Sequence, residues 1–340
     1  MNAAIVPGTV FRDHRGEVAQ LHGIGILKSD GRYFAWGEDK SEGDRFAGIS
    51  CYSSEDLAQW RFEGISLGTG CGDLAHNRII ERPKVLAHPD GYFVMALHID
   101  SLDYAEARVG FAVARSPVGP YEYLGSERPL GNVSRDIGVF QEDGVGFLLS
   151  EDRDQGLHIY RLTPDYLGID RVVTTLTGDP ATSGLESPSL IAHGGFYYLF
   201  GSSLTGWNHN DNSYTTAPAL TGPWTPWRRF APEGSHTFES QVSVVLPIET
   251  ARGNRFIYIG DRWTPASLAT SPAVWLPLTV DAGVASLEWV AKWSLDELCC
   301  ASVFPDPLLT ARMGRPLARE PDGDSQCRPL KTFTIGDSTP

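Results

Sequence analysis

The segment DGYFVMALH at residues 90–98 holds the pattern on which the fold depends, because a similar segment occurs four more times along the chain. In each copy a turn of Gly, Asp or Asn leads into an aromatic and β-branched run, which predicts a β-strand. The other copies are GRYFAWGE at 31–38, DGVGFLLSE at 143–151, GGFYYLFGS at 194–202 and NRFIYIGD at 254–261. Their spacing of roughly 50 to 60 residues is typical of the blades of a propeller.

A second strand and then a tryptophan, tyrosine or leucine follow most copies, as in ISCYSSEDLAQW at 49–60 and LHIYRLTPDYL at 157–167. Amphipathic helical periodicity is nearly absent, and 36 glycines and 23 prolines supply turns between short strands. The sequence therefore predicts an all-β fold, a five-bladed β-propeller over residues 1–305. Beyond about Pro305 the pattern stops, so residues 306–340 are predicted to form a C-terminal strap or a disordered tail.

Composition and charge restrict the class of ligand. The 340 residues are 41% hydrophobic and 21% charged, which is typical of a globular protein. The chain has 42 acidic and 28 basic residues, a net charge of -14, and no Lys/Arg-rich run. Nucleic acids and anionic membranes are therefore not expected as partners, and a neutral ligand fits better.

The N-terminal residues 1–10 show no basic region followed by an apolar stretch, and the sequence has no run of roughly 18 apolar residues. We therefore expect a soluble, cytoplasmic protein, while secretion after loss of a signal stays open. The five cysteines are an odd number without CxxC spacing, so neither a disulfide framework nor a zinc site is indicated.

Polar side chains interrupt the predicted innermost strands near their starts. They are Glu81 in RIIERPKVL, Asp136 in VSRDIGVF, Glu186 in SGLESPSLI and Gln241 in FESQVSVVL. Since the innermost strands of a propeller line its central channel, we expect these four groups to meet near one axis.

Convergent carboxylates indicate glycoside hydrolysis, which needs a general acid for the leaving oxygen and a second group that activates water or attacks the sugar. Alternatively, Glu81 and Asp136 pair with the adjacent Arg82 and Arg135 and hold blades together. Repetition at equivalent blade positions favours the site. Glu186 has no basic residue before it, and partial burial is expected to raise its pKa, as a general acid requires.

Aromatic residues in the strands are interpreted mainly as structural, because strands favour them. Trp207, Trp263 and Tyr104 are exceptions, since they follow predicted strands and are expected either to stack on pyranose faces or to pack at the rim. Asp261 is expected to form an ion pair with Arg262 and to bind sugar hydroxyls as well.

Several segments together resemble glycoside hydrolase family 43, and within it the exo-β-1,3-galactanases (galactan 1,3-β-galactosidases). HGIGILKSDGRYFAWGE from His22 is similar to the opening HGGGI and YYWYGE segments of that subfamily, and ERPKVL with HID to its ERPKV and MHID pair. SRDIGVF, LESPSLIAHGGFYYLFGSSLTGW, GDRWTPAS and VWLPL resemble its SRD, REAPA with TGW, GDRW and VWLPL segments, in the same order. His22 is accordingly placed among the residues that bind the sugar.

The resemblance implies that Glu186 is the general acid, that Asp136 sets its pKa and orientation, and that Glu81 binds sugar hydroxyls. Most family members carry an aspartate base in the first blade, where this chain reads LHGIGIL. In the subfamily a glutamine is proposed as the base, and Gln241 matches it. Because an uncharged amide is a poor proton acceptor, we expect Gln241 to position the attacking water.

The acid motif departs from the subfamily, because LESPS has Leu185 where REAPA has arginine. The missing cation either leaves Glu186 less stabilised as the anion or marks a changed subsite. Family 43 enzymes invert the anomeric configuration, which requires roughly 6.5 to 9.5 Å between the acid and the water-activating group.

The histidines His22, His98 and His209 do not share metal-ligand spacing, so no catalytic metal and no required cofactor are expected. A structural calcium ion on the axis stays open, as does the oligomeric state.

The predicted function is an inverting glycoside hydrolase, exo-acting on β-1,3-galactan or related galactosides. One alternative is a galactan-binding pseudoenzyme, because no ordinary base is present. Another is a different family 43 specificity, arabinofuranosidase or galactofuranosidase, which the altered LESPS motif favours.

Overall fold

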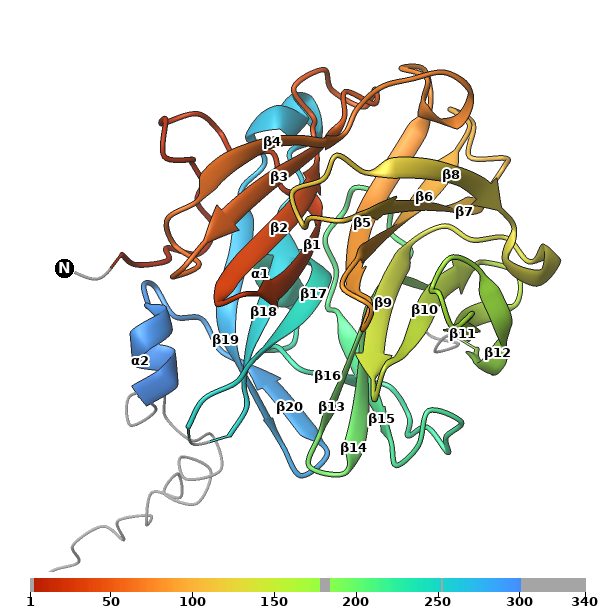
Figure 1. Ribbon diagram of the computed structural model, residues 1–340. Helices are drawn as coiled ribbons and strands as arrows, with labels where there is room; N and C mark the ends of the chain where they lie inside the picture. The colour runs from red at the N-terminus through yellow and green to blue at the C-terminus, as the bar shows by residue number, and fades with distance from the viewer. Residues whose placement is uncertain (1–2, 178–183, 252, 301–340) are drawn as a thin grey trace, which may run out of the picture. The chain divides into compact units, whose positions relative to one another are not determined.

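The structure is a computed structural model that describes residues 3–177, 184–251 and 253–300. It contains five four-stranded antiparallel sheets, each built from four consecutive strands (Figure 1). The first sheet is β1 (His22–Ser29), β2 (Arg32–Glu38), β3 (Ile49–Ser54) and β4 (Arg61–Leu67). The second sheet is β5 (Ile79–Ala87), β6 (Phe93–Asp100), β7 (Arg108–Ala114) and β8 (Glu122–Glu127).

The remaining three sheets repeat this order. The third sheet is β9 (Ile137–Glu142), β10 (Val145–Asp152), β11 (Gly156–Leu162) and β12 (Ile169–Leu176). The fourth sheet is β13 (Leu185–His193), β14 (Phe196–Ser203), β15 (Ser213–Ala217) and β16 (Arg228–Arg229). The fifth sheet is β17 (Gln241–Ile248), β18 (Arg255–Asp261), β19 (Ala273–Asp281) and β20 (Val284–Leu287).

Helical segments are short and lie in the connections. They are α1 (His236–Glu239), α2 (Leu295–Cys300), and the short 3-10 helices η1 (Gly72–Leu74), η2 (Pro129–Gly131) and η3 (Pro265–Thr270). None of the helices in the described ranges is long and apolar enough to cross a bilayer.

The first strand of each sheet is its innermost strand. β1, β5, β9, β13 and β17 contact one another in succession, and β17 contacts β1 again, so the ring is closed. Figure 1 shows the first and last blades side by side. The predicted five-bladed β-propeller is confirmed. The five repeated segments of the sequence correspond to the second strands β2, β6, β10, β14 and β18.

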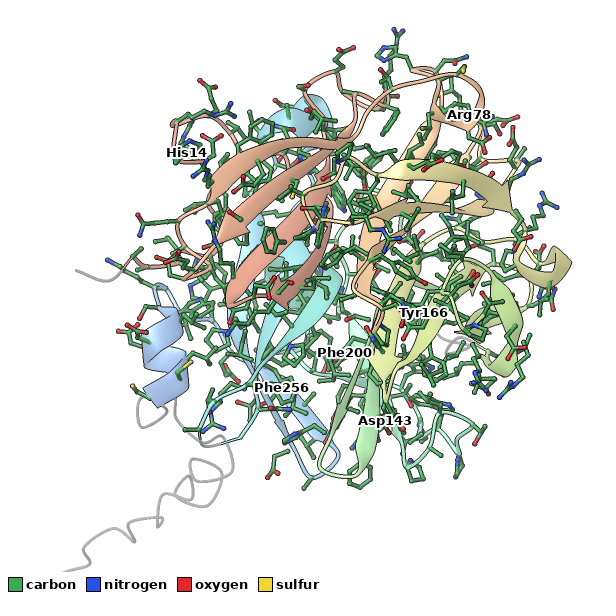
Figure 2. The ribbon with its side chains drawn as sticks, in the orientation of Figure 1. His14, Arg78, Asp143, Tyr166, Phe200 and Phe256 are labelled. Atoms are coloured by element: carbon green, nitrogen blue, oxygen red, sulfur yellow. The ribbon has the colours of Figure 1, made fainter. Side chains whose placement is uncertain are left out.

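The hydrophobic core is divided into five clusters, and each fills the space between two neighbouring blades. Phe200 of β14 and Phe256 of β18 lie in the cluster between the fourth and fifth blades (Figure 2). Trp275 lies in the cluster between the fifth and first blades. Each sheet therefore buries its faces against its neighbours, which is why the full ring folds as one unit.

The ring closes through packing and the N-terminal segment, because each sheet contains strands of its own blade only among the described residues. Ile5 forms an antiparallel bridge with Trp293, and Thr9 forms one with Ala273 on the fifth blade. The chain divides into a unit of residues 1–304 and a segment of residues 305–340. The predicted strap or tail at 306–340 lies outside the described residues.

Two glycines let the innermost strands approach at the axis. A Cβ atom on Gly25 of β1 would lie 2.2 Å from the carbonyl oxygen of Pro83, and one on Gly138 of β9 would lie 2.1 Å from that of Pro188. Any side chain there would push neighbouring blades apart. The glycines of GIGIL and DIGVF therefore set how closely the site residues of adjacent blades can meet.

Candidate active site

A cleft of about 210 Å³ opens where the innermost strands begin. The four polar residues predicted at the strand starts line this central cleft together, as do three of the predicted aromatic residues: Glu81, Asp136, Glu186, Gln241, Tyr104, Trp207 and Trp263. The prediction that these groups meet around one axis is confirmed.

Irregular backbone turns these side chains toward the cleft. The register of β5 shifts directly after Glu81, and that of β13 shifts directly after Glu186. The next residues, Arg82 and Ser187, both have a φ of 54°, in the left-handed region. β-bulges commonly re-aim a side chain next to a functional site, and here the same bulge recurs in different blades.

Glu186 lies between two hydrogen-bond donors. Arg153 Nη2 donates to its Oε1 over 3.0 Å, and Gln241 Nε2 donates to its Oε2 over 3.3 Å. Burial and then the charges of Asp136 and Glu151 raise the pKa of Glu186 to about 8. The side chain therefore carries its proton at neutral pH, as the predicted general acid requires.

Gln241 has a defined amide orientation, because its oxygen faces groups that can only donate. Arg82 Nη2 donates to Oε1 over 2.5 Å, and Trp263 Nε1 donates over 3.2 Å. The amide nitrogen donates to Ser202 Oγ over 2.8 Å as well as to Glu186. Both ends of the amide are thus held by named partners, which fixes the side chain without giving it a charge.

A strained turn leads into Gln241. All four residues of α1 (His236–Glu239) have positive φ values between 51° and 56°, which is costly for residues other than glycine. Arg262 donates to the carbonyl oxygens of Phe238 and Glu239, and Thr237 Oγ1 accepts the backbone N–H of Asn212. Neighbouring segments therefore hold this unfavourable turn in place immediately before the site residue.

The distance expected between the acid and the water-positioning group is wrong for this arrangement of side chains. The acid and the water-positioning group were expected roughly 6.5 to 9.5 Å apart. Instead Glu186 Oε2 and Gln241 Nε2 are in direct contact at 3.3 Å. The physical reason is that both are largely enclosed polar groups, and each provides the other with a hydrogen-bond partner. A water molecule cannot fit between these two atoms in this arrangement.

Arg82 lines the cleft and connects several blades there. Its Nη2 lies 3.0 Å from Asp136 Oδ2, and its Nη1 lies 3.6 Å from Asp261 Oδ2. The surrounding carboxylates raise the already high pKa of Arg82 despite its burial. Asp136 does form an ion pair, but its partner is Arg82 of the neighbouring blade and not the adjacent Arg135. Arg135 instead faces Asp100 at 3.8 Å.

Glu81 is held ionised by its surroundings. His98 Nδ1 lies 3.3 Å from its Oε2, and the Tyr104 hydroxyl donates to its Oε1 over 3.1 Å. Burial acts to raise the pKa of Glu81, but the hydrogen bond from His98 and the charge of Lys40 outweigh it and lower the pKa. Asp100 accepts from the other ring nitrogen of His98, and these carboxylates raise the pKa of His98 to about 9 against the effect of burial. An ionised Glu81 is suited to accept hydrogen bonds from hydroxyl groups.

Two residues that were predicted to contact the sugar, His22 and Asp261, lie beneath the cleft and do not line it. His22 is 5% exposed and stacks on Trp263, with ring centroids 5.5 Å apart, and burial lowers its pKa to about 4. Asp261 is 4% exposed and faces Arg82, not the adjacent Arg262. Burial raises the pKa of Asp261 to about 6. Both residues therefore support Trp263 and Arg82 from below, and their expected direct contact with the sugar does not fit these positions.

Trp207 stands at the rim. It is 52% exposed, and its ring meets that of Trp263 edge to face with centroids 5.6 Å apart. It also lines a second hollow of about 480 Å³, which shares Lys40 with the central cleft and continues toward residues 265–269. The exposed ring therefore lies at the junction of two hollows, where a chain-like ligand could cross it.

The difference from the subfamily motif at Leu185 does not alter the cleft. Leu185 is 8% exposed and belongs to the core cluster between the third and fourth blades, where its side chain covers Gly201. Since neighbouring residues of a strand face opposite sides, Glu186 points to the cleft while Leu185 points into the core. The change from arginine therefore affects packing, and the cation beside Glu186 comes from Arg153 instead.

The second strands carry a further set of polar residues, one on each strand, of which Asp261 was predicted from the sequence as a site residue and the other four were not. In register, His22 pairs with Glu38, Glu81 with His98, Glu186 with Ser202 and Gln241 with Asp261, and the backbone N–H of Glu151 donates to the carbonyl oxygen of Asp136. The sequence did contain a signal for them. Each of the five repeated segments ends in one of these residues: Glu38, His98, Glu151, Ser202 and Asp261.

Two further residues near the site, Lys40 and Lys84, were not predicted from the sequence, and neither belongs to the set that ends the repeated segments. Lys40 follows β2, and its Nζ lies 2.8 Å from Glu38 Oε2. Lys84 is buried below the cleft, and its ammonium group donates to the carbonyl oxygens of Gly23 and Ile24 on β1. Burial lowers the pKa of Lys84 to about 7. Within residues 3–177, 184–251 and 253–300, no group of three His, Cys, Asp or Glu side chains could hold a metal ion.

Comparison with known proteins places this geometry in a family. A model described as "Glycosyl hydrolases family 43" matches residues 25–242. Curated protein sequences gave no match.

Solved structures show the same relationship. The chain is 45% identical to a protein from Bifidobacterium bifidum s17 described as a candidate exo-β-1,3-galactanase, over 85% of this chain and 96% of that one, with a TM-score of 0.80. It is 36% identical to the exo-β-1,3-galactanase from Phanerochaete chrysosporium solved with β-1,3-galactotriose, over 86% and 68% of the two chains, with a TM-score of 0.82. For the exo-β-1,3-galactanase from Clostridium thermocellum the identity is 34%, the coverage 85% and 66%, and the TM-score 0.80. With the five blades, the cleft and the family match all in agreement, this chain belongs to glycoside hydrolase family 43.

Proposed function

We propose that this glycoside hydrolase removes galactose from the non-reducing end of β-1,3-galactan or related galactosides, with inversion. The observation that carries the proposal is Glu186, a carboxyl group with a pKa raised to about 8 in the same cleft as Glu81, Asp136 and Gln241. The similarity to exo-β-1,3-galactanases, one of them with β-1,3-galactotriose bound, supports the choice of substrate.

In this scheme Glu186 gives its proton to the glycosidic oxygen, and the bond between that oxygen and C1 breaks. For inversion the direct contact between Glu186 and Gln241 has to open, so that the sugar lies between them. A water molecule positioned by Gln241 then adds its oxygen to C1 from the face opposite Glu186 and releases one proton to solvent, which later returns to Glu186. The products are two sugars with free hydroxyl groups. The scheme uses side chains and water alone.

The neighbouring residues prepare these groups. Asp136 raises the pKa of Glu186, while its ion pair with Arg82 keeps it in place. Glu81, held by Tyr104 and His98, accepts hydrogen bonds from sugar hydroxyls. Trp263 and Trp207 offer apolar ring faces to the pyranose.

The test is a panel of substrates. The wild type is incubated with β-1,3-galactan and with nitrophenyl β-galactopyranoside, α-arabinofuranoside and β-galactofuranoside, and released sugar is quantified. We expect galactose from galactan and cleavage of the galactopyranoside. Preference for either furanoside would replace this proposal with the other family 43 specificities.

A second candidate function is galactan binding without hydrolysis. It is favoured by the amide oxygen of Gln241, which already accepts hydrogen bonds from Arg82 and Trp263 and has no charge with which to retain a proton. Calorimetry with β-1,3-galactotriose, together with an assay for free galactose, separates hydrolysis from binding alone. Binding of the trisaccharide without any release of galactose supports only the second candidate.

The pH dependence follows from the protonation of Glu186. Because its pKa is raised to about 8, the acid form is present below that value and is lost as the pH rises through it. We expect kcat on β-1,3-galactotriose to fall as the pH rises through about 8. A rate that stays constant well above that pH would contradict the assignment of Glu186.

Trp207→Ala is expected to weaken substrate binding. The variant removes an exposed ring at the junction of the two hollows, and aromatic contacts of this kind contribute about 0.5 to 1.5 kcal/mol. KM is therefore expected to rise by roughly 2-fold to 10-fold with a smaller change in kcat. Trp289→Ala is the matched control, since Trp289 is 43% exposed but packs against Phe238 away from the cleft. An equal effect of both variants would rule out a specific role for Trp207.

A further inference from the structure

Arg153 lies in the turn after β10, in the third blade, and reaches the acid of the fourth blade. Its Nη2 donates to Glu186 Oε1 over 3.0 Å, and its Nε donates to Glu151 Oε1 over 2.8 Å. One guanidinium therefore joins two carboxyl groups on different blades.

Glu151 is a rigid partner for this guanidinium. Its side chain is 2% exposed, and its other oxygen, Oε2, accepts the backbone N–H of Asp136 over 3.2 Å. Burial and then the charge of Asp136 raise the pKa of Glu151, and the charge of Arg153 opposes this effect. Arg153 is itself about half exposed, with 47% of its side-chain surface accessible, so its position depends on the buried carboxyl group that it contacts.

We propose that Arg153, held by Glu151, is a positioning residue that stabilises the negative charge formed on Glu186 when this acid gives up its proton. The inference rests on the proposed function for the role of Glu186. As the proton passes to the glycosidic oxygen, the electron pair of the O–H bond stays on the Glu186 carboxylate. The guanidinium already donates to an oxygen of that group, so it opposes the new charge directly.

Charged groups of both signs act on Glu186. Two carboxyl groups, Asp136 and Glu151, raise its pKa, and two guanidinium groups, Arg153 and Arg82, lower it, while Gln241 contributes a neutral donor. Arg82 is already engaged with Asp136. Arg153 is therefore the cation in contact with Glu186 itself.

Opposite effects are expected for two substitutions. Arg153→Met removes the stabilising charge, so the alkaline limb of the kcat profile is expected to move up by about one pH unit, because an opposite charge at this range lowers a carboxyl pKa by about 1 to 3 units. Glu151→Gln removes a repelling carboxyl group while its amide oxygen still accepts from Arg153, so the limb is expected to move down.

Further readouts separate this role from a purely structural one. In Arg153→Met, kcat on β-1,3-galactotriose is expected to fall by about 10-fold with little change in KM, since one pKa unit corresponds to a factor of ten in proton affinity. The loss is expected to shrink for a dinitrophenyl galactoside, whose leaving group needs no proton. Arg153→Lys restores part of the shift. Arg171→Met is the matched control, because Arg171 is an exposed arginine of β12 in the same blade.

The pKa of Glu186 is also measured without turnover, from the carbon-13 shifts of labelled Glu side-chain carboxyl groups assigned with Glu186→Gln. A higher pKa in Arg153→Met and a lower one in Glu151→Gln support the inference. Unchanged values, or shifts of both variants in the same direction, overturn it. Failure of the wild type to release galactose would instead refute the proposed function and leave this titration as the deciding measurement.

Discussion

Glu186→Gln is expected to lower kcat on β-1,3-galactan by a factor on the order of 10² to 10⁴, the range found for the loss of a general acid. The amide keeps the size of the side chain, and its oxygen can still accept the hydrogen bond from Arg153. Its NH2 group then faces the Gln241 amide donor in place of the second oxygen, and it has no acidic proton to transfer. Binding of β-1,3-galactotriose, measured by calorimetry, is expected to stay within a few-fold of the wild type.

Two controls make this result specific. Glu122→Gln changes an exposed carboxylate at the start of β8, far from the cleft in sequence and structure, and is expected to leave kcat unchanged. A dinitrophenyl galactoside, which departs without a proton, is expected to recover much of the lost rate in Glu186→Gln. If Glu186→Gln keeps natural-substrate activity within tenfold of the wild type, another residue is the acid.

Gln241→Ala is expected to lower kcat by a factor on the order of 10² to 10⁴, with a much smaller change in KM, because the attacking water loses its positioning group. The structure adds a second reason, since the amide also holds Arg82, Trp263 and Ser202. Ser202→Ala is the matched control, because it removes one partner of the amide and leaves the amide itself. Steady-state kinetics of Gln241→Ala that match the wild type would mean that a different group directs the water.

Gln241→Glu tests the same position with a charge. The new carboxylate keeps its contact with the Arg82 guanidinium and supplies a true base. The substitution also replaces the amide nitrogen that donates to Glu186 Oε2 over 3.3 Å with a carboxyl oxygen, so two carboxyl groups face each other. The pKa of Glu186 is then expected to rise further, so activity is kept at neutral pH and the alkaline limb moves up.

Much of this architecture follows from short sequence patterns. The segment DGYFVMALH and its four relatives predict the second strands. Four of the innermost strands are marked by a polar residue at or near their start: Glu81, Asp136, Glu186 and Gln241. This is so because strands pair with their neighbours in sequence, and every blade repeats the same strand order.

Contacts between blades were not predictable in the same way. The pairing of Arg153 with Glu186 joins two blades, and it depends on how closely the innermost strands approach, which no local pattern encodes. The burial of His22 and Asp261 beneath Trp263 and Arg82 is a similar case, because sequence shows that a residue opens or ends a strand but not its depth below the cleft.

The leucine at position 185 shows how a motif can mislead. Its difference from the subfamily pattern suggested an altered acid, whereas the strand alternation turns that side chain into the core and leaves the acid facing Arg153. Only the position of a residue on its strand decides whether a change in a motif reaches the chemistry.

The most direct test of the central claim is the anomeric form of the first product. The wild type is mixed with β-1,3-galactotriose, and proton NMR spectra are collected before mutarotation equilibrates the sugar. Inversion predicts that galactose appears first as the α-anomer, together with the disaccharide, and Glu186→Gln is expected to release neither. Initial release of β-galactose, or binding of the trisaccharide with no galactose released by the wild type, would contradict it.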